Sequence, residues 1–408
     1  MPEPGQPAPA APAASYRWLL LAGVWLQYMA FGLVATSLAP LVGLIEADLS
    51  LSHAAMGSTM GAWQLVYIFS AIPCGMLLDR LGARNALLIG SLLIAASVLA
   101  RGFATNYLEL LLAVSLFGLG GPIISAGAPK VVTNWFTGSD RGLAMGIYMT
   151  GPAIGGIVSL TLTHPVLLPA LDSWRNVMFL WAGVTAAAGI SWYMLAANPR
   201  VDKRDANASA SLPQLQVMAK LLRQPAVLLV LMMSVGVFLF NHGLNNWLPE
   251  LLRNGGMSLI EAGYWAAIPT VIGLVGSLLI PRLATPGRRF NILLGLALCA
   301  AGASILLHFS TGPLLFGGLF LQGIARSALM TVLILTLVEL PGIGERYAGM
   351  ASGLFFSAAE VGGVLGPLSL GFLYDLTHSF DAGLYLLTTV AVLLALGAQR
   401  LKGLARSE

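Results

Sequence analysis

One arginine stands alone within a long apolar stretch. Residues 311–338 carry no formal charge except Arg326, which lies at least twelve residues from either end of the stretch. If this stretch crosses a bilayer, an arginine at its centre costs roughly 2.5–3.5 kcal/mol or more on insertion scales. Its side chain is too short to reach either surface. Arg326 is therefore predicted to face the interior of a helix bundle, where it either pairs with an acid or binds a ligand.

Glu360 occupies a comparable place in the next apolar stretch, within the segment Phe356-Ser357-Ala358-Ala359-Glu360. Two interpretations of the pair Arg326–Glu360 stay open. In the first, the two charges neutralise each other permanently and pin two helices together. In the second, Glu360 is a protonatable carboxylate that alternately engages and frees Arg326, which then holds an anion.

Polar and aromatic side chains at similar depths complete a predicted central cavity. An unsatisfied amide is costly in hydrocarbon, so the amides are the stronger candidates, whereas aromatic residues at helical spacing more often serve packing. His242 is interpreted as a packed histidine near the outer face, and Trp63, Tyr67 and Trp265 as further wall residues. Besides Arg326 and Glu360, the predicted binding residues are Gln27, Tyr28, Gln64, Tyr148, Asn241, Asn245 and Gln322.

The composition and the apolar runs indicate that membrane-spanning helices position these residues. The chain has 408 residues, of which 57% are hydrophobic and 9% charged, whereas about a quarter of the residues of soluble proteins are charged. Apolar runs of about 20 residues, each long enough to cross a bilayer as a helix, alternate with short polar links. The runs predict twelve helices, which begin at Tyr16, Ser52, Arg84, Asn106, Arg141, Trp174, Pro225, Ser258, Phe290, Gly312, Tyr347 and Ala382.

One polar segment divides these runs into two sets of six. The predicted fold is an all-α membrane protein whose twelve transmembrane helices form two pseudo-symmetric six-helix bundles. The first run is too long for the apolar region of a signal peptide and is interpreted as a retained span. The expected domains are a disordered tail at 1–15, a bundle at 16–197, a cytoplasmic inter-bundle loop at 198–224, a second bundle at 225–402 and a tail at 403–408.

The basic residues support this count. With twelve spans, only Arg101, Arg175 and Arg253 of the 21 Lys and Arg residues fall on one face and Arg326 within a span, while the rest fall on the face of the two termini. Cytoplasmic loops carry an excess of Lys and Arg. The sequence therefore predicts a multi-pass protein of the cytoplasmic (inner) membrane with both termini in the cytoplasm.

Several kinds of chemistry find no support in the sequence. No basic stripe interleaved with aromatic residues predicts a nucleic-acid partner. Cys74 and Cys299 both lie in apolar runs, so neither a disulfide nor a metal site is expected. No metal-ligand cluster, nucleophile elbow or phosphate loop predicts an enzyme, and no cofactor is expected. The expected partners are the lipid bilayer and a small-molecule substrate, with a coupling proton or counter-substrate, and the protein is expected to be monomeric.

A short charged link joins the second and third apolar runs. It reads Gly75-Met76-Leu77-Leu78-Asp79-Arg80-Leu81-Gly82-Ala83-Arg84. This pattern resembles the Gly-x-x-x-Asp-Arg-x-Gly-x-Arg signature of the major facilitator superfamily. The resemblance implies a gating role: Asp79 helps to latch the two bundles in the outward-open state, and Arg80 and Arg84 lie near lipid headgroups. Gly75 and Gly82 belong to the same predicted gate.

The fifth run contains Gly151, Pro152, Gly155 and Gly156, small residues at helical spacing around a proline. Such residues let helix backbones approach closely in lipid, and the proline permits a bend. The stretch also resembles the Gly-x-x-x-x-Gly-Pro-x-x-Gly-Gly motif of antiporters in the superfamily, so it joins the predicted gating residues.

The two halves repeat weakly. Gly57 corresponds to Gly263, the pair Gly155-Gly156 to Gly362-Gly363, and the charged link to residues 281–289. Parallel repeats of six spans are expected when two bundles rock about a site at the midplane.

These features favour a secondary transporter that moves a small anionic or polar metabolite by alternating access. The fourth run lacks the arginine that many proton-coupled members carry before its glycines, at Ser115-Leu116-Phe117-Gly118. Ala128-Pro129-Lys130 and Asn246-Trp247-Leu248-Pro249 resemble the cyanate/nitroimidazole branch and, more distantly, nitrate/nitrite carriers. The alternatives are an efflux antiporter of drugs or other hydrophobic compounds and, from another class, a membrane-embedded enzyme or sensor.

Overall fold

The computed structural model describes residues 14–197, 214–340 and 343–407, and every regular element in these ranges is a helix. Residues 1–13 of the expected tail and most of the loop at 198–224 lie outside the described residues, and the first helix begins at Ala14 rather than at Tyr16. The first half contains α1 Ala14–Thr36, η1 Ala39–Leu41, α2 Val42–Leu49, α3 His53–Phe103, α4 Tyr107–Trp135, α5 Gly138–Leu162, η2 Thr163–Leu167, α6 Leu168–Leu171 and α7 Trp174–Leu195. The second contains α8 Gln214–Leu222, α9 Pro225–Asn254, α10 Leu259–Leu283, α11 Arg289–Leu306, α12 Gly312–Val338, α13 Gly344–Thr377 and α14 Asp381–Ser407.

The charged link turns within α3. Gly82 has φ 77° and ψ 164°, a conformation outside the helical region, so the 51 residues of α3 form two helices joined at a kink. Glycine tolerates a positive φ because it has no Cβ. Eleven helices among the described residues are long and apolar enough to cross a membrane. With α3 counted as two spans, the prediction of twelve spans in an all-α membrane protein is confirmed.

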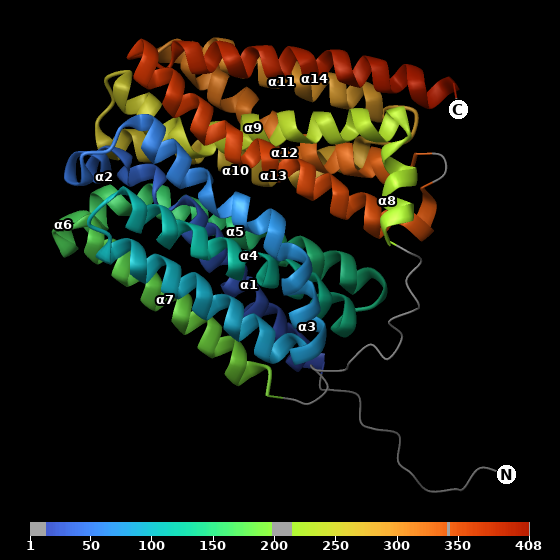
Figure 1. Cartoon of the computed structure of the whole chain (residues 1–408), viewed down its shortest axis with the longest axis horizontal. Helices are drawn as coiled ribbons and strands as arrows, with labels where there is room; N and C mark the ends of the chain where they lie inside the picture. Colours follow the sequence, from blue (N-terminus) through green and yellow to red (C-terminus); the bar gives the residue numbers. More distant parts are fainter. Residues whose placement is uncertain (1–13, 198–213, 341–342, 408) are drawn as a thin grey trace, which may run out of the picture.

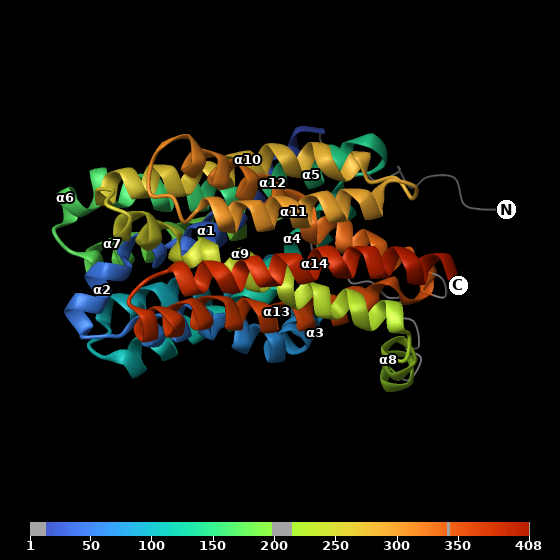
Figure 2. The ribbon, with the colours of Figure 1, turned by 90° about the horizontal axis from the view of Figure 1, so that it is seen from above.

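The helices form two groups that diverge from one end (Figure 1). The groups converge at the end that carries α2 and α6 and separate toward the end where α1 begins and α14 ends. We call these the closed end and the open end. In the second view, α8 projects from the edge of the bundle at the open end (Figure 2).

The glycines of the predicted repeat occupy matching places. A Cβ on Gly155 of α5 would collide with the backbone of Met29 on α1, and one on Gly362 of α13 would collide with the backbone of Val235 on α9. Gly151 packs on α1 as well, with a Cβ position 3.0 Å from the Met29 nitrogen. Each half therefore presses its fifth span onto its first through small residues, as close helix packing in lipid requires.

The second repeated pair joins the halves to each other. The backbone of Gly57 on α3 abuts the Pro367 carbonyl of α13, and Gly263 on α10 abuts the Leu160 carbonyl of α5. In each case the second span of one half meets the fifth span of the other. The two crossings are related by the same pseudo-symmetry as the sequence repeat.

Aromatic stacking and helix capping close one end. The Asp375 carboxylate of α13 accepts hydrogen bonds from the backbone N–H groups of His53 (3.1 Å) and Ala54 (2.8 Å) at the start of α3. The His53 ring stacks on Tyr374 with a centroid distance of 3.9 Å and on Trp247 at 5.1 Å. A carboxylate at a helix N-terminus is favourable, so these contacts hold the two halves together at the closed end.

The charged link lies at the open end and pairs within its own half. Asp79 accepts a hydrogen bond from Lys130 of α4 at 2.7 Å, and Arg84 donates to the Tyr193 carbonyl at 3.1 Å. In the second half the equivalent place holds the ion pair Arg289–Glu339. The resemblance assigns to Asp79 a latch between the two bundles in the outward-open state, and this latch stays a prediction.

Candidate substrate-binding cavity

A cavity of about 760 Å³ lies between the two halves. Its wall comes from four helices of the first half, α1, α3, α4 and α5, and four of the second, α9, α10, α12 and α13. The two sets are equivalent under the repeat. Toward the closed end, Asn245, Thr270 and Arg326 also line a small pocket with Gly156 and Leu160, so these three residues lie at the bottom of the cavity.

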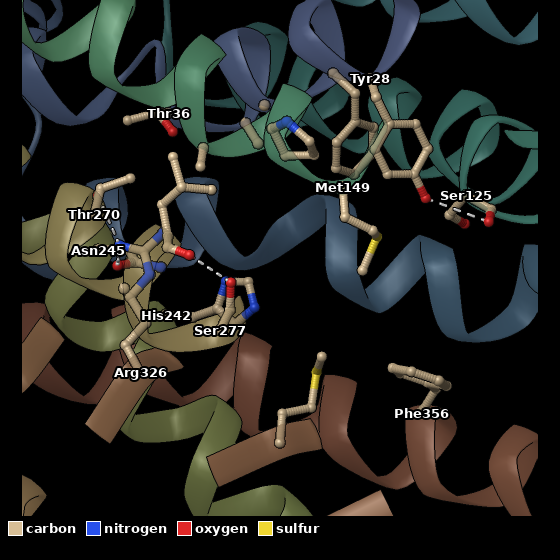
Figure 3. Close-up of a pocket in the computed structure, with 18 of the residues that line it drawn as sticks. Tyr28, Thr36, Ser125, Met149, His242, Asn245, Thr270, Ser277, Arg326 and Phe356 are labelled. Carbon is tan, nitrogen blue, oxygen red and sulfur yellow. Dashed lines mark hydrogen bonds between the residues drawn. The ribbon is translucent and has the colours of Figure 1, made fainter. Parts of the chain in front are cut away.

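Arg326 points into this cavity from α12, as Figure 3 shows. Its Nη1 donates to Asn245 Oδ1 at 2.5 Å and to Thr270 Oγ1 at 3.0 Å. None of the ion pairs among the described residues involves Arg326. Its charge is therefore held by neutral groups at the edge of an open space.

Glu360 does not lie where we expected it. It is absent from the cavity wall and is 7% exposed, and its Oε2 is a buried atom with no hydrogen-bond partner among the described residues. A Cβ on Gly363 would stand 2.9 Å from this oxygen and 3.0 Å from Gln64 Cγ. The expected pair with Arg326 is thus not formed, because α13 packs chiefly on α9 and α3 and turns Glu360 toward the α3 crossing.

The other predicted binding residues divide into two groups. Tyr28, Tyr148 and Asn245 line the cavity. The remaining amides, Gln27, Gln64, Asn241 and Gln322, are absent from its wall. Gln27 and Gln64 have partners in the helix packing: Gln27 Nε2 lies 3.4 Å from the Leu87 carbonyl, and Gln64 Nε2 lies 3.2 Å from His242 Nδ1.

Several wall residues escaped the sequence analysis. Thr270, Gly273, Leu274 and Ser277 lie on one face of α10, and Asn246 lies on the face of α9 that carries His242 and the predicted Asn245. Both sets follow the i, i+3, i+4 spacing of a helix face, which could have revealed them. His242 was expected near the outer face, but it lines the cavity instead.

An aromatic cluster covers the wall of the first half. The Tyr28 ring contacts Tyr148 edge-on at 5.1 Å and stacks on Phe31 at 6.1 Å. Phe31 in turn meets Trp63, which meets Tyr67, both with centroid distances of 6.2 Å. We call Tyr28, Phe31, Trp63, Tyr67 and Tyr148 the aromatic wall.

A family model places this arrangement among known proteins. The model described as Major Facilitator Superfamily matches residues 24–367. The chain belongs to the Major Facilitator Superfamily. It is therefore a multi-pass membrane transporter by family and not an enzyme, and the family predicted from the charged link is confirmed. The branch stays a prediction.

Relatives within the Major Facilitator Superfamily cover most of the chain. It is 26% identical over 383 residues to the uncharacterized transporter YycB of Bacillus subtilis, which covers 91% of this chain and 90% of that protein. It is 27% identical to a quinolone resistance transporter of Acinetobacter baumannii, with 84% of each chain covered. A D-galactonate transporter of Escherichia coli is 24% identical, with 96% of each chain covered.

Solved structures share the fold. The crystal structure of a bacterial homolog to the human lysosomal transporter Spinster, in an inward-facing and unoccupied conformation, matches with a TM-score of 0.77 at 16% identity. It covers 97% of this chain and 98% of that one. The twelve-helix arrangement is thus that of a Major Facilitator Superfamily transporter.

Proposed function

We propose that this protein is a secondary transporter of a small organic anion, and that Arg326 binds the anion. The observation that carries the proposal is the state of the guanidinium: it faces the cavity, and among the described residues only Nη1 has hydrogen-bond partners, both of them neutral. A buried cation without a counter-charge is costly. An anionic substrate supplies the missing charge together with charge-assisted hydrogen bonds.

The relatives agree with an anionic substrate. Proteins named as a D-galactonate transporter, a hexuronate transporter and a probable sulfoacetate transporter are 24–25% identical to this chain over at least 90% of its length. All three names denote organic acids. Their substrates do not transfer to this chain by similarity alone, but they favour the same class of cargo.

Alternating access is the mechanism that the packing supports. The halves meet at the closed end through α3–α13 and α5–α10, whereas the open end leaves glycines such as Gly75 and Gly353 without neighbours within 4 Å of a Cβ position. If one bundle rocked against the other, the closed end would open and the open end would close around a site that stays in place. We place the open end and both termini in the cytoplasm, at the inner membrane, because most basic residues lie there.

The test is transport by purified protein in proteoliposomes. Arg326→Gln removes the charge, and we expect a loss of about 100-fold in the binding of any transported organic anion, since hydrogen bonds to charged groups contribute about 1.5–3 kcal/mol. Arg326→Lys should retain part of the activity. The matched control is Arg282→Gln, an exposed arginine at the end of α10, which should transport normally. Normal anion transport by Arg326→Gln would overturn the proposal.

Export of hydrophobic compounds is the second candidate. The quinolone resistance relative and the aromatic wall favour it. An apolar cargo would leave the charge of Arg326 uncompensated, and so we rank this function second. It predicts that Arg326→Gln transports its substrates as well as the native chain does.

A further inference from the structure

The two sides of the cavity differ in chemistry. The first half contributes the aromatic wall and no formally charged residue, while the second contributes Arg326 with the neutral polar groups of Asn245, Thr270 and Ser277. Figure 3 shows the polar and the apolar side chains at opposite ends of the cavity: Arg326, Asn245 and Thr270 cluster together, and Tyr28, Met149 and Phe356 lie away from them. A ligand that fills the space must therefore be polar at one end only.

The aromatic wall offers mainly ring faces and edges: two of its hydroxyl groups are engaged within the protein, and only the Tyr148 hydroxyl and the Trp63 indole N–H have no hydrogen-bond partner among the described residues. The Tyr67 hydroxyl already shares a hydrogen bond of 2.7 Å with Ser125 Oγ, and the Tyr28 hydroxyl donates to the Ser125 carbonyl at 3.3 Å. A polyhydroxylated body placed here has more hydroxyl groups than these two side chains can satisfy, and each one left without a partner costs about 1–3 kcal/mol. An aromatic ring would instead make edge-to-face contacts.

The charge at the other end limits the ligand to one negative charge. Arg326 is the only Arg, Lys, Asp or Glu among the described residues that line the cavity. A second carboxylate on the ligand would be taken from water without a cationic partner, which is strongly unfavourable. A planar carboxylate also matches the fork of a guanidinium, and Arg326 Nε and Nη2 have no hydrogen-bond partner among the described residues.

We propose that the cavity binds an aromatic monocarboxylate, with its carboxylate on Arg326 and its ring between the aromatic wall and Phe356. This inference rests on the proposed function, because it needs Arg326 to bind an anion. It goes further in excluding polyhydroxylated and dianionic acids. Phe356 completes the ring site from the second half, since it lines the cavity and is 38% exposed.

The first test is calorimetric titration of the purified full chain with matched probes. Benzoate should bind, and benzamide, which keeps the ring and loses the charge, should bind at least about tenfold more weakly. Cyclohexanecarboxylate, which keeps the charge and loses the aromatic ring, should bind about two- to tenfold more weakly than benzoate. D-galactonate and phthalate should compete poorly with benzoate.

The second test uses two phenylalanines of α13. Phe356→Leu should weaken benzoate about two- to tenfold and leave cyclohexanecarboxylate nearly unchanged. Phe372→Leu is the matched control, because Phe372 is exposed on the same helix and does not line the cavity; it should leave both affinities unchanged.

The outcomes separate the two proposals. If D-galactonate binds through Arg326 and benzoate does not, the aromatic inference is overturned while the proposed function stands. If benzamide binds as well as benzoate and Arg326→Gln retains both, the anion site itself is wrong. If folded protein binds benzoate no better than cyclohexanecarboxylate, the ring site is refuted.

Discussion

Arg101 and Arg326 are both arginines inside the helix bundle, but Arg101 is buried, Arg326 is half-buried, and their surroundings differ. Arg101 on α3 is 2% exposed and lines none of the described cavities. Its Nη1 donates to the Val34 carbonyl (3.3 Å) and to Ser37 Oγ (3.1 Å), and its Nη2 donates to Ser97 Oγ (3.3 Å). These partners fix the end of α1, where helix carbonyls lack internal donors and a cation is favourable.

Arg326 is held less completely. One of its nitrogens has protein partners, and the rest of the guanidinium faces space that a ligand can fill. Burial of a charge in a membrane span is thus not by itself a sign of substrate binding. Arg101 Nε is also buried without a hydrogen-bond partner among the described residues, but Arg101 adjoins none of the described cavities. What distinguishes the two arginines is therefore whether the unpartnered part of the guanidinium faces space for a ligand, and we can test this by giving Arg326 an acidic partner within the protein.

The largest effect is expected from Asn245→Asp. The new carboxylate would form an ion pair with Arg326 in place of the present hydrogen bond at 2.5 Å, and the substrate anion would meet a neutralised site. We expect benzoate affinity to fall about 100-fold while the midpoint of thermal unfolding is retained. Asn241→Asp is the matched control on α9, because Asn241 does not line the cavity. Unchanged affinity in Asn245→Asp would show that the charge of Arg326 does not serve the ligand.

Arg101→Met should have the opposite effect to Asn245→Asp, with lower stability and unchanged benzoate affinity. It removes the three hydrogen bonds to Val34, Ser37 and Ser97. We expect a loss of roughly 2 kcal/mol in the free energy of unfolding. Benzoate affinity of the folded protein should not change. Thermal unfolding and calorimetric titration on the same sample measure both quantities. A selective loss of affinity with full stability would assign Arg101 to the transport site.

The sequence predicted the fold because a bilayer restricts the alternatives so strongly. Hydropathy and the bias of basic residues sufficed for twelve spans, and the matched glycines Gly155 and Gly362 reflected a real structural repeat. Arg326 could be found because it is the only charge in its span. Arg101 was assigned to a membrane face because it lies near the end of its span, where an arginine can reach water, but its side chain is buried.

The direction of side chains was the part that the sequence could not supply. Helices that are apolar on all sides give no hydrophobic stripe from which to read their orientation. Glu360 and Gln64 were therefore assigned to the cavity, although both lie at the crossing of α3 and α13. Thr270 and Ser277, which do line the cavity, looked like ordinary small polar residues of a span.

The last comparison, with the smallest expected effect, is between Glu360, an acid outside the cavity, and Arg326, a base that lines it. Its unpartnered Oε2 lies near Gln64, which contacts His242 on the cavity wall. An ionised carboxylate is costly at this buried place. We therefore expect Glu360 to hold a proton while the α3–α13 crossing is closed and to release it when the crossing opens. Glu360→Gln should flatten the pH dependence of benzoate uptake into proteoliposomes, yet change benzoate affinity by no more than about twofold, because the two sites share no contact.

The control for this variant is Glu109→Gln, since Glu109 is exposed at the start of α4 and should leave the pH profile as it is. If Glu360→Gln keeps the native profile, Glu360 is a structural residue of the crossing and does not carry a proton during transport. If it instead lowers affinity as strongly as Arg326→Gln does, the acid and the base belong to one site, and the separation between cavity and crossing fails. A flattened profile with retained affinity would assign the proton and the anion to different helices of the same half, α13 and α12, so that one rocking movement could carry both.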